Sequence, residues 1–318
     1  MTTMLVANNC TRESGSFMGD QLCSLKTAYL FVQNASDVDR VIMSVSPKNE
    51  MSFLWDKFIG NPRGDGSLPP AELIHDNWDP GDWTARWNTW DRWKSERRVT
   101  TDDGAVHGFQ HYRELYLRIH GATRQTVLCG SERGLGHKNI YEYWLAGQED
   151  MSDSWAGTDW FDDTLIDHPP RRPERDVYVS PFAKTQGNLT FTFDFWSNVV
   201  HQLVDADVTV TVGYEGQFCR DLEGHPNYRR HWGSYREWMK EICRHKLVAC
   251  GNTGTGWLAA ACGVPMITME PHNSVMRDHR YRECGLKNLV EVVDGERLDE
   301  FGNNMDRVAE YTARRMIN

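Results

Sequence analysis

The segment from Lys246 to Met269 constrains the fold more than any other part of the sequence. Two apolar runs flank a glycine-rich turn and a run of small residues, which Gly263 and Pro265 bring to an end. Glycine and proline end helices, and short apolar runs are typical of buried strands. The four expected elements are therefore the strand Lys246–Cys250, the loop Gly251–Gly256, the helix Trp257–Cys262 and the strand Val264–Met269. Strands joined through a helix run parallel, so this segment predicts an α/β fold.

The same alternation of strands and helices extends over both halves of the chain. In the first half we expect strands at Met4–Ala7, Arg40–Val45 and Gln125–Cys129, and a helix from Leu22 to Val32. In the second half we expect strands at Val177–Ser180 and Val208–Val212, and helices at Phe193–Val204, Tyr235–Cys243 and Met305–Met316. Each half is therefore predicted to be a Rossmann-like α/β layer.

The length of the chain, 318 residues, exceeds the usual size of a single hydrophobic core. The segment Asp167–Arg175 combines proline and charge without apolar spacing, which is typical of a linker. We therefore expect a boundary near residue 170, with domains at residues 1–170 and 171–318.

The first domain is expected to carry an insertion at about residues 61–104, which is rich in tryptophan, proline and glycine. Within it the pattern favours a helix at Trp83–Arg98, and one face of that helix carries Trp83, Trp87, Trp90 and Trp93. Such a face usually packs against a sheet, and the alternative is a surface that stacks on sugar rings or bases.

Composition excludes several classes of protein. No stretch approaches about 18 consecutive apolar residues, and the amino terminus has neither a basic start nor a long apolar run, so we expect a cytoplasmic protein without a transmembrane segment. The net charge of −10 argues against general binding to a phosphate backbone. The eight cysteines form no CxxC pair and have no histidine-rich spacing, so we expect no structural metal.

The turn before the expected helix is suited to a phosphate group. A strand that runs directly into a helix places backbone N–H groups and the positive end of a helix dipole at one point. Asn252, Thr253 and Thr255 can cap the helix and donate hydrogen bonds, and Gly254 and Gly256 complete the turn. Glycine turns of this kind are common in α/β proteins, so these residues alone leave a ligand site and plain turn geometry equally open.

The stretch Asn252–Pro265 resembles the donor-binding motif of heptosyltransferase-like glycosyltransferases, the family 9 type with the GT-B fold. In that family a strand is followed by the sequence Asp or Asn, Thr and Gly. A short spacer and a His come next, and then Leu-Ala-Ala-Ala and a strand that begins with Gly-Val-Pro. Here Asn252–Gly254 match the first part, and Leu258–Ala261 with Gly263–Pro265 match the second. Trp257 stands where the family has His, which alters the donor contact made there. The resemblance implies two Rossmann-like domains that face a central cleft.

A second motif of that family opens the first expected helix. Gly19 and Asp20 follow the loop after the first strand, and the resemblance implies that Asp20 is the general base that deprotonates the acceptor hydroxyl. Taken alone, Asp20 would more often be an acid that caps a helix, but the order of the two motifs along the chain favours the catalytic role. Gly19, and Arg12 on the same loop, are expected to contact the acceptor.

Two further residues are assigned to the donor. The family carries a basic residue after the strand that opens the second domain, and Lys184 matches it, although a lone loop lysine is more often only solvated. Glu270, just past the strand that ends at Met269, is expected to hold ribose hydroxyls, as acids at strand ends of dinucleotide folds do.

The resemblance implies an inverting transfer of a sugar from a nucleoside-diphosphate sugar to a glycan or another hydroxyl acceptor, without a metal and without a cofactor beyond that co-substrate. A hydroxylated base in DNA is a less favoured acceptor, suggested by Arg92–Arg98, Arg171–Arg172 and Arg229–His231, which are more simply solvated charges. A nucleotide-sugar epimerase and a noncatalytic nucleotide- or glycan-binding protein stay open as other classes.

Overall fold

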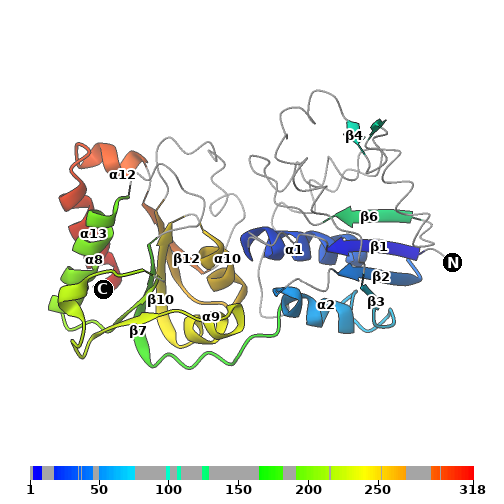
Figure 1. Cartoon of the computed structure of the whole chain (residues 1–318), viewed down its shortest axis with the longest axis horizontal. Helices are drawn as coiled ribbons and strands as arrows, with labels where there is room; N and C mark the ends of the chain where they lie inside the picture. Colours follow the sequence, from blue (N-terminus) through cyan, green and yellow to red (C-terminus); the bar gives the residue numbers. More distant parts are fainter. Residues whose placement is uncertain are drawn as a thin grey trace. The chain divides into compact units, whose positions relative to one another are not determined.

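The structure is a computed structural model of the whole chain. It describes residues 3–8, 18–34, 36, 38–45, 50–75, 98–100, 106–108, 124–128, 165–181, 191–214, 216–251, 253–269, 288–293 and 295–318. The chain divides into two compact units, Met1–Trp155 and Ala156–Asn318, and each contains a parallel sheet with helices (Figure 1). The expected α/β class with two Rossmann-like layers is confirmed. None of the helices that the structure describes is both long and apolar enough to span a bilayer.

The first unit contains a four-stranded sheet in the order β3-β2-β1-β6, and all of its pairings are parallel. Its strands are β1 (Thr3–Asn8), β2 (Arg40–Val45), β3 (Glu72–His75) and β6 (Arg124–Leu128). Its helices are α1 (Met18–Asn34), α2 (Asp56–Gly60) and the short 3₁₀ turn η1 (Ser52–Trp55). A separate antiparallel pair joins β4 (Arg98–Thr100) to β5 (Val106–Gly108).

Helix α1 forms because apolar residues recur at helical spacing along one face. Leu22, Leu25, Tyr29 and Val32 are all buried in the core of the first unit. Phe58 of α2 lies 5.9 Å from Tyr29 and 5.8 Å from Trp55, measured between ring centroids, so aromatic contacts tie α1, η1 and α2 together. This packing fixes the position of the first turn of α1.

The second unit contains a six-stranded, all-parallel sheet in the order β12-β11-β10-β7-β8-β9. The strands are β7 (Arg175–Ser180), β8 (Val210–Gly213), β9 (Tyr228–His231), β10 (His245–Gly251), β11 (Met266–Met269) and β12 (Leu289–Val293). The first strand along the chain, β7, is central, and the chain builds outward from it first to β8 and β9 and then to β10, β11 and β12. This is the strand order of a complete Rossmann sheet.

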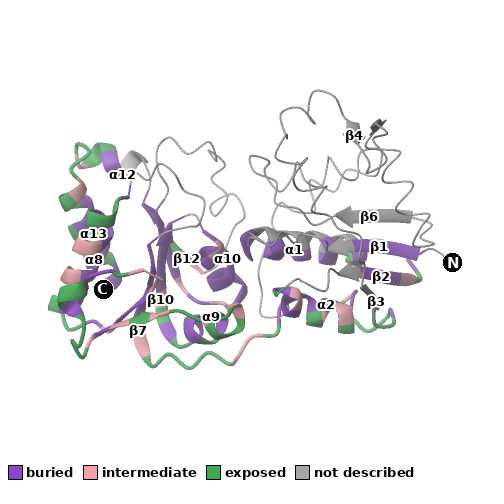
Figure 2. Ribbon diagram, in the orientation of Figure 1, coloured by how far each residue is buried: buried purple, intermediate pink, exposed green. Residues whose placement is uncertain are grey.

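Helices cover both faces of this sheet (Figure 1). Helices α8 (Phe193–Asp205) and α13 (Met305–Ile317) pack together on one face, with α12 (Gly295–Glu300) beside them, and α9 (Tyr235–Ile242) and α10 (Gly254–Ala261) lie on the other. The strands between the helices are mostly buried (Figure 2). The core on the α8 side is formed by residues such as Val177, Val179 and Trp196.

Several sequence expectations need correction. Helix α10 begins at Gly254 rather than Trp257, because Thr253 caps it, so half of the expected loop is helical. Strand β3 pairs with β2, so the expected insertion at residues 61–104 begins with a strand of the first sheet. The expected helix Trp83–Arg98 lies outside the described residues except for Arg98, which begins the strand β4.

The segment expected to be a linker is bound to the second unit. The Arg172 amide donates to the Cys243 carbonyl at 3.2 Å, and the Glu174 amide donates to the Arg244 carbonyl at 2.9 Å. Arg171 Nη1 donates to the Gly263 carbonyl at 2.9 Å. Residues 165–174, called the strap below, therefore follow the ends of α9 and α10, and the boundary expected near residue 170 falls inside the second compact unit.

Candidate functional site

The turn between β10 and α10 is fixed by hydroxyl side chains. Thr253 is the N-cap of α10, and its Oγ1 accepts a hydrogen bond from the Thr255 amide at 3.2 Å. The Gly256 amide donates to the Thr253 carbonyl at 3.1 Å. These two amides are already paired within the turn, so the start of α10 offers a ligand the positive end of the helix dipole more than a row of open amides.

The other end of α10 explains why such a short helix stops where it does. Gly263 has a positive φ of 63°, a conformation that favours glycine. Its amide donates to the Ala260 carbonyl at 3.0 Å, and the Val264 amide donates to the Ala259 carbonyl at 2.9 Å, which together form a Schellman motif. The predicted ending at Gly263 is confirmed. Buried alanines allow the helix to lie close to β10 and β11.

The β10–α10 turn lies at the switch point of the sheet. β7 and β10 are neighbours, but the chain leaves them toward opposite sides, to β8 from the one and to β11 from the other. Ligands of doubly wound sheets bind outside the carboxyl ends of the strands at such a point. Here the last residue of β7, Ser180, lies 2.8 Å from Thr255, measured between Oγ and Oγ1, and both residues are buried. A hydroxyl pair therefore joins the two strand ends that border the switch point.

The structure brings five of the expected donor residues together at this turn, namely Thr253, Gly254, Thr255, Gly256 and Trp257. Trp257 is only 4% exposed. The other expected donor residues, Lys184, Asn252 and Glu270, lie outside the described residues. Their roles stay predictions.

The first unit presents the second motif in a comparable place. Gly19 and Asp20 lie in the first turn of α1, which follows β1, and β1 lies between β2 and β6 at the switch point of its own sheet. Gly19 is buried. The next residue, Gln21, is fully buried, and its Oε1 accepts a hydrogen bond from Trp55 Nε1 at 3.1 Å. Arg12 lies outside the described residues.

A buried polar network on the α9 side of the second sheet was not indicated by the sequence. His245 Nδ1 donates to the Glu241 carbonyl at 2.7 Å, and its Nε2 accepts from Thr211 Oγ1 at 2.8 Å. Burial first, and then the nearby Arg229, lower the pKa of His245 to about 3, so the ring is neutral. Arg229 also forms an ion pair with the buried Glu241. His245 begins β10 and Glu241 lies near the end of α9, so the network joins that helix to the sheet.

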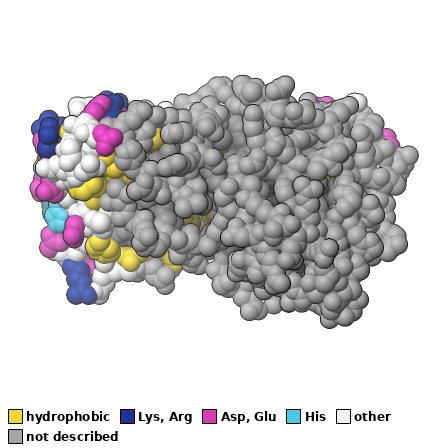
Figure 3. All heavy atoms as spheres, turned by 90° about the horizontal axis from the view of Figure 1, so that it is seen from above, with side chains coloured by type: hydrophobic (Ala, Val, Ile, Leu, Met, Phe, Trp, Pro, Cys, Tyr) yellow, Lys and Arg dark blue, Asp and Glu magenta, His cyan; other side chains and the backbone are white. Residues whose placement is uncertain are grey.

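Three of the arginines that suggested a track for DNA have side-chain partners in the structure. Arg229 pairs with Glu241, Arg230 pairs with Glu223 at 2.8 Å, and Arg171 donates to a backbone carbonyl. Where described side chains are visible in Figure 3, acidic and basic groups are interspersed. These pairings leave the DNA acceptor without support.

Comparison with solved structures extends these observations to the whole fold. A family 9 glycosyltransferase from Veillonella parvula superimposes with a TM-score of 0.56 at 9% sequence identity, covering 99% of this chain and 97% of that one. The ADP-heptose lipopolysaccharide heptosyltransferase II of E. coli superimposes with a TM-score of 0.51 at 11% identity, covering 100% of this chain and 98% of that one. The E. coli heptosyltransferase WaaC with ADP superimposes with a TM-score of 0.50 at 15% identity, covering 98% of this chain and 99% of that one.

At the level of sequence, no protein-family model matches the chain, and no curated protein matches it significantly. The likeness is therefore one of fold. Each of the solved structures is matched over nearly its full length, which includes both units and the segments between them. The resemblance first indicated by the two motifs is borne out in three dimensions, because the chain has the two-unit, GT-B-like fold that the family 9 heptosyltransferases also have.

Proposed function

We propose that the protein is an inverting glycosyltransferase that moves a sugar from a nucleoside-diphosphate sugar to an acceptor hydroxyl. The observation that carries this proposal is the hydroxyl-lined turn at the switch point of the second sheet, where Ser180 meets Thr255. The start of α10 contains no acidic side chain in its first turn, so its dipole is free to attract an anion. A leaving diphosphate is the anion that fits this arrangement.

The donor is proposed to bind across this turn. Thr253, Thr255 and the glycines Gly254 and Gly256 would meet the diphosphate, with Asn252 and Lys184 beside it. Glu270 would hold the ribose hydroxyls, and Trp257 would replace the histidine that the family uses for the donor. The helix dipole and Lys184 would stabilise the charge that develops on the diphosphate, so that no step passes through a metal.

The acceptor is proposed to bind to the first unit, near Arg12 and Gly19. Asp20 would take the proton from the acceptor hydroxyl while its oxygen attacks the anomeric carbon and the bond to the diphosphate breaks. A single displacement inverts that carbon. A carboxylate at the start of a helix is stabilised in its ionised form, and the proposal relies on this effect to keep Asp20 able to accept a proton at neutral pH.

The proposal is tested by the substitution Asp20→Asn. Removal of a general base lowers the turnover rate by about 10²–10⁴-fold, whereas the donor affinity stays within about twofold because the donor binds to the other unit. The matched control is Asp56→Asn, which makes the same change at the first turn of α2. Release of the nucleoside diphosphate is measured with and without acceptor. Full activity of the Asp20→Asn protein would remove the proposed base.

A thermal-shift panel of nucleoside diphosphates and their sugars identifies the donor, because a ligand that binds the native state raises its melting temperature. ADP-sugars are tested first, since the solved E. coli heptosyltransferase contains ADP. Conversion of the donor to a new sugar without acceptor would show an epimerase instead. Binding without any turnover, unchanged by Asp20→Asn, would show a noncatalytic binding protein.

A further inference from the structure

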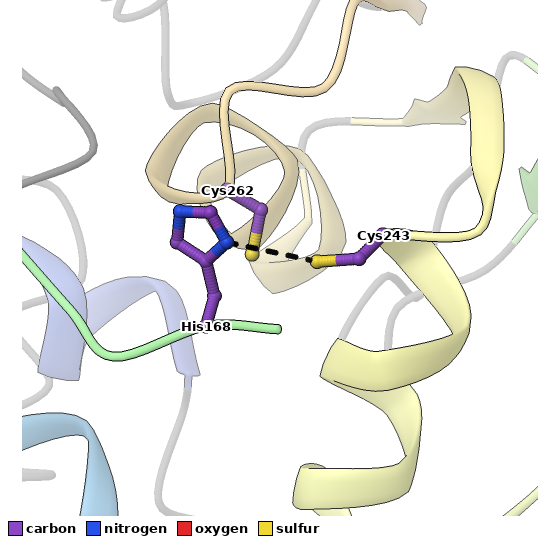
Figure 4. Close-up of side chains that lie close together, drawn as sticks. All are labelled: His168, Cys243 and Cys262. Carbon is purple, nitrogen blue, oxygen red and sulfur yellow. Dashed lines mark hydrogen bonds between the residues drawn. The ribbon is translucent and has the colours of Figure 1, made fainter. Parts of the chain in front are cut away.

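Three metal-ligating side chains meet in the second unit, at a place that the proposed reaction does not use (Figure 4). His168 belongs to the strap, and Cys243 and Cys262 are the C-cap residues of α9 and α10. One ligand atom from each residue lies within 4.8 Å of those of the other two. Both cysteines are buried, and neither is part of a disulfide bond. These three residues are called the His–Cys cluster.

The sulfur atoms of the cluster lie beside the imidazole ring of the strap. Cys243 Sγ lies 4.0 Å from His168 Nδ1. Cysteine binds metals as the thiolate, so two sulfur ligands and one nitrogen ligand are available at this point once the cysteines give up their thiol protons.

The backbone around the cluster also favours positive charge. Helices α9 and α10 both end at the cluster, and a helix carries partial negative charge at its carboxyl end. Two negative helix ends and two cysteine sulfur atoms thus meet at one point. The strap is already tied to the same two ends, through the Cys243 carbonyl and the Gly263 carbonyl.

We propose that His168, Cys243 and Cys262 bind a Zn²⁺ ion that joins the strap to the ends of α9 and α10. A set of one nitrogen and two sulfur ligands selects zinc over magnesium or calcium, which prefer oxygen. The cluster fills three tetrahedral positions, and water fills the fourth. On binding, each cysteine that still carries its thiol proton releases it to solvent, and His168 binds through a neutral ring nitrogen.

The histidine needs a small adjustment to serve as a ligand. His168 Nδ1 lies 2.9 Å from the Pro169 carbonyl, so in the metal-free form its N–H donates to the strap. The ring then presents to zinc either Nδ1, after its proton has moved to Nε2 and the hydrogen bond to Pro169 has been given up, or Nε2, after a rotation. In either case the ion would join His168, a residue of the strap, to the two cysteines.

The position of the cluster assigns the ion a structural role. Helix α10 has eight residues, so its C-cap lies about 12 Å from the turn at which the donor is proposed to bind. The ion would join Cys243 to a residue 75 positions earlier in the chain. Closing a long loop in this way stabilises the folded unit. The three ligands are widely separated in the sequence, which is why the cysteine spacing predicted no structural metal.

The test measures metal binding on the full-length chain. Purified protein is expected to retain a single zinc ion by elemental analysis, and Co²⁺ added to the zinc-free protein is expected to give thiolate charge-transfer and tetrahedral d–d absorption bands. Cys243→Ser and Cys262→Ser should each lower the Co²⁺ affinity by more than about tenfold and weaken the charge-transfer band. His168→Gln should lower the affinity but keep that band. Cys219→Ser, at a buried free cysteine outside the cluster, is the control and should change neither.

Several outcomes would overturn the proposal. Wild-type protein that binds neither zinc nor cobalt would do so, as would equal loss of binding in the Cys219→Ser control. Alkylation and mass spectrometry would also overturn it by finding Cys243 and Cys262 joined as a disulfide in the native protein. If the serine variants fail to fold, His168→Gln decides the question because His168 is only partly buried, and unchanged Co²⁺ affinity in that variant would contradict the site.

Discussion

Helices α1 and α10 both begin at the switch point of a sheet but differ in the residues of their first turns and in packing. α1 follows β1, the first strand of its sheet along the chain, whereas α10 follows β10, the fourth strand of its own. The first turn of α1 includes an acidic residue, Asp20. α10 has Thr253 as its N-cap and no acid in its first turn. The proposed function accordingly assigns a proton acceptor to the first unit and an anion to the second.

The two helices also pack differently. α1 has 17 residues and buries large side chains, including Leu22 and Leu25. α10 has eight residues and buries small ones such as Ala259 and Ala260. A long helix with a wide apolar face can hold its own position, whereas a short one depends on its caps and on close contact with the sheet. Three experiments can break or sharpen this comparison.

The largest expected effect is on the packing of α1. Leu25→Ala leaves a cavity at a fully buried position and should lower the stability of the first unit by about 2–5 kcal/mol. Hydrogen exchange measured segment by segment should show faster exchange in β1, β2 and α1, with α10 unchanged. Leu73→Ala is the control, because that side chain is 44% exposed. Equal effects of the two substitutions would mean that the face of α1 is not the core of its unit.

The next effect concerns charge at the start of α10. Thr253→Asp keeps an N-cap side chain but places a carboxylate beside the proposed diphosphate, so nucleotide affinity should fall on the order of 100-fold while α10 stays protected from exchange. The matched control is Asn304→Asp, at the N-cap of α13, which should leave the affinity unchanged. Calorimetric titration measures both. Tight binding by the Thr253→Asp protein would show that the anion binds elsewhere.

The smallest effect concerns the hydroxyl pair at the switch point. Ser180→Ala and Thr255→Val each remove one partner of a buried hydrogen bond and should each cost about 1 kcal/mol of stability in the second unit. The double variant should cost less than the sum, with a coupling energy of about 0.5–1.5 kcal/mol. The free energies of unfolding for the cycle are measured by denaturant titration, with hydrogen exchange in β7 and α10 as the local readout. Purely additive losses would show that the two hydroxyls do not interact.

Much of the fold was predictable because hydrophobic periodicity dominates the elements that carry the core. The strand Arg40–Val45 is found with the bounds expected from its apolar run, and the helices expected at Phe193–Val204 and Met305–Met316 agree with α8 and α13 to within a residue. Edge strands were missed. β9 has the sequence YRRH, whose arginines pair with Glu241 and Glu223, so nothing in its composition marks it as a strand.

The candidate site was predictable only where local sequence encodes it. The turn at Thr253 and the first turn at Asp20 each lie in a contiguous motif next to a strand. The contact between Ser180 and Thr255 depends on strand order, and the His–Cys cluster depends on where two helices end. Neither the contact nor the cluster can be recognised from spacing along the chain, because only the topology of the sheet brings these residues together.

The central position of β7 has a consequence for synthesis of the protein. β7 leaves the ribosome before any of its neighbours, yet one of its two edges must wait for β10, whose Lys246 pairs with Asp176, 70 residues earlier. Until β10 is made, one edge of β7 has unpaired backbone N–H and C=O groups, and an unpaired edge can pair with the wrong strand. A chain that ended before Gly251 would therefore lack the strand that joins the two halves of the sheet, which meet only when β10 has emerged.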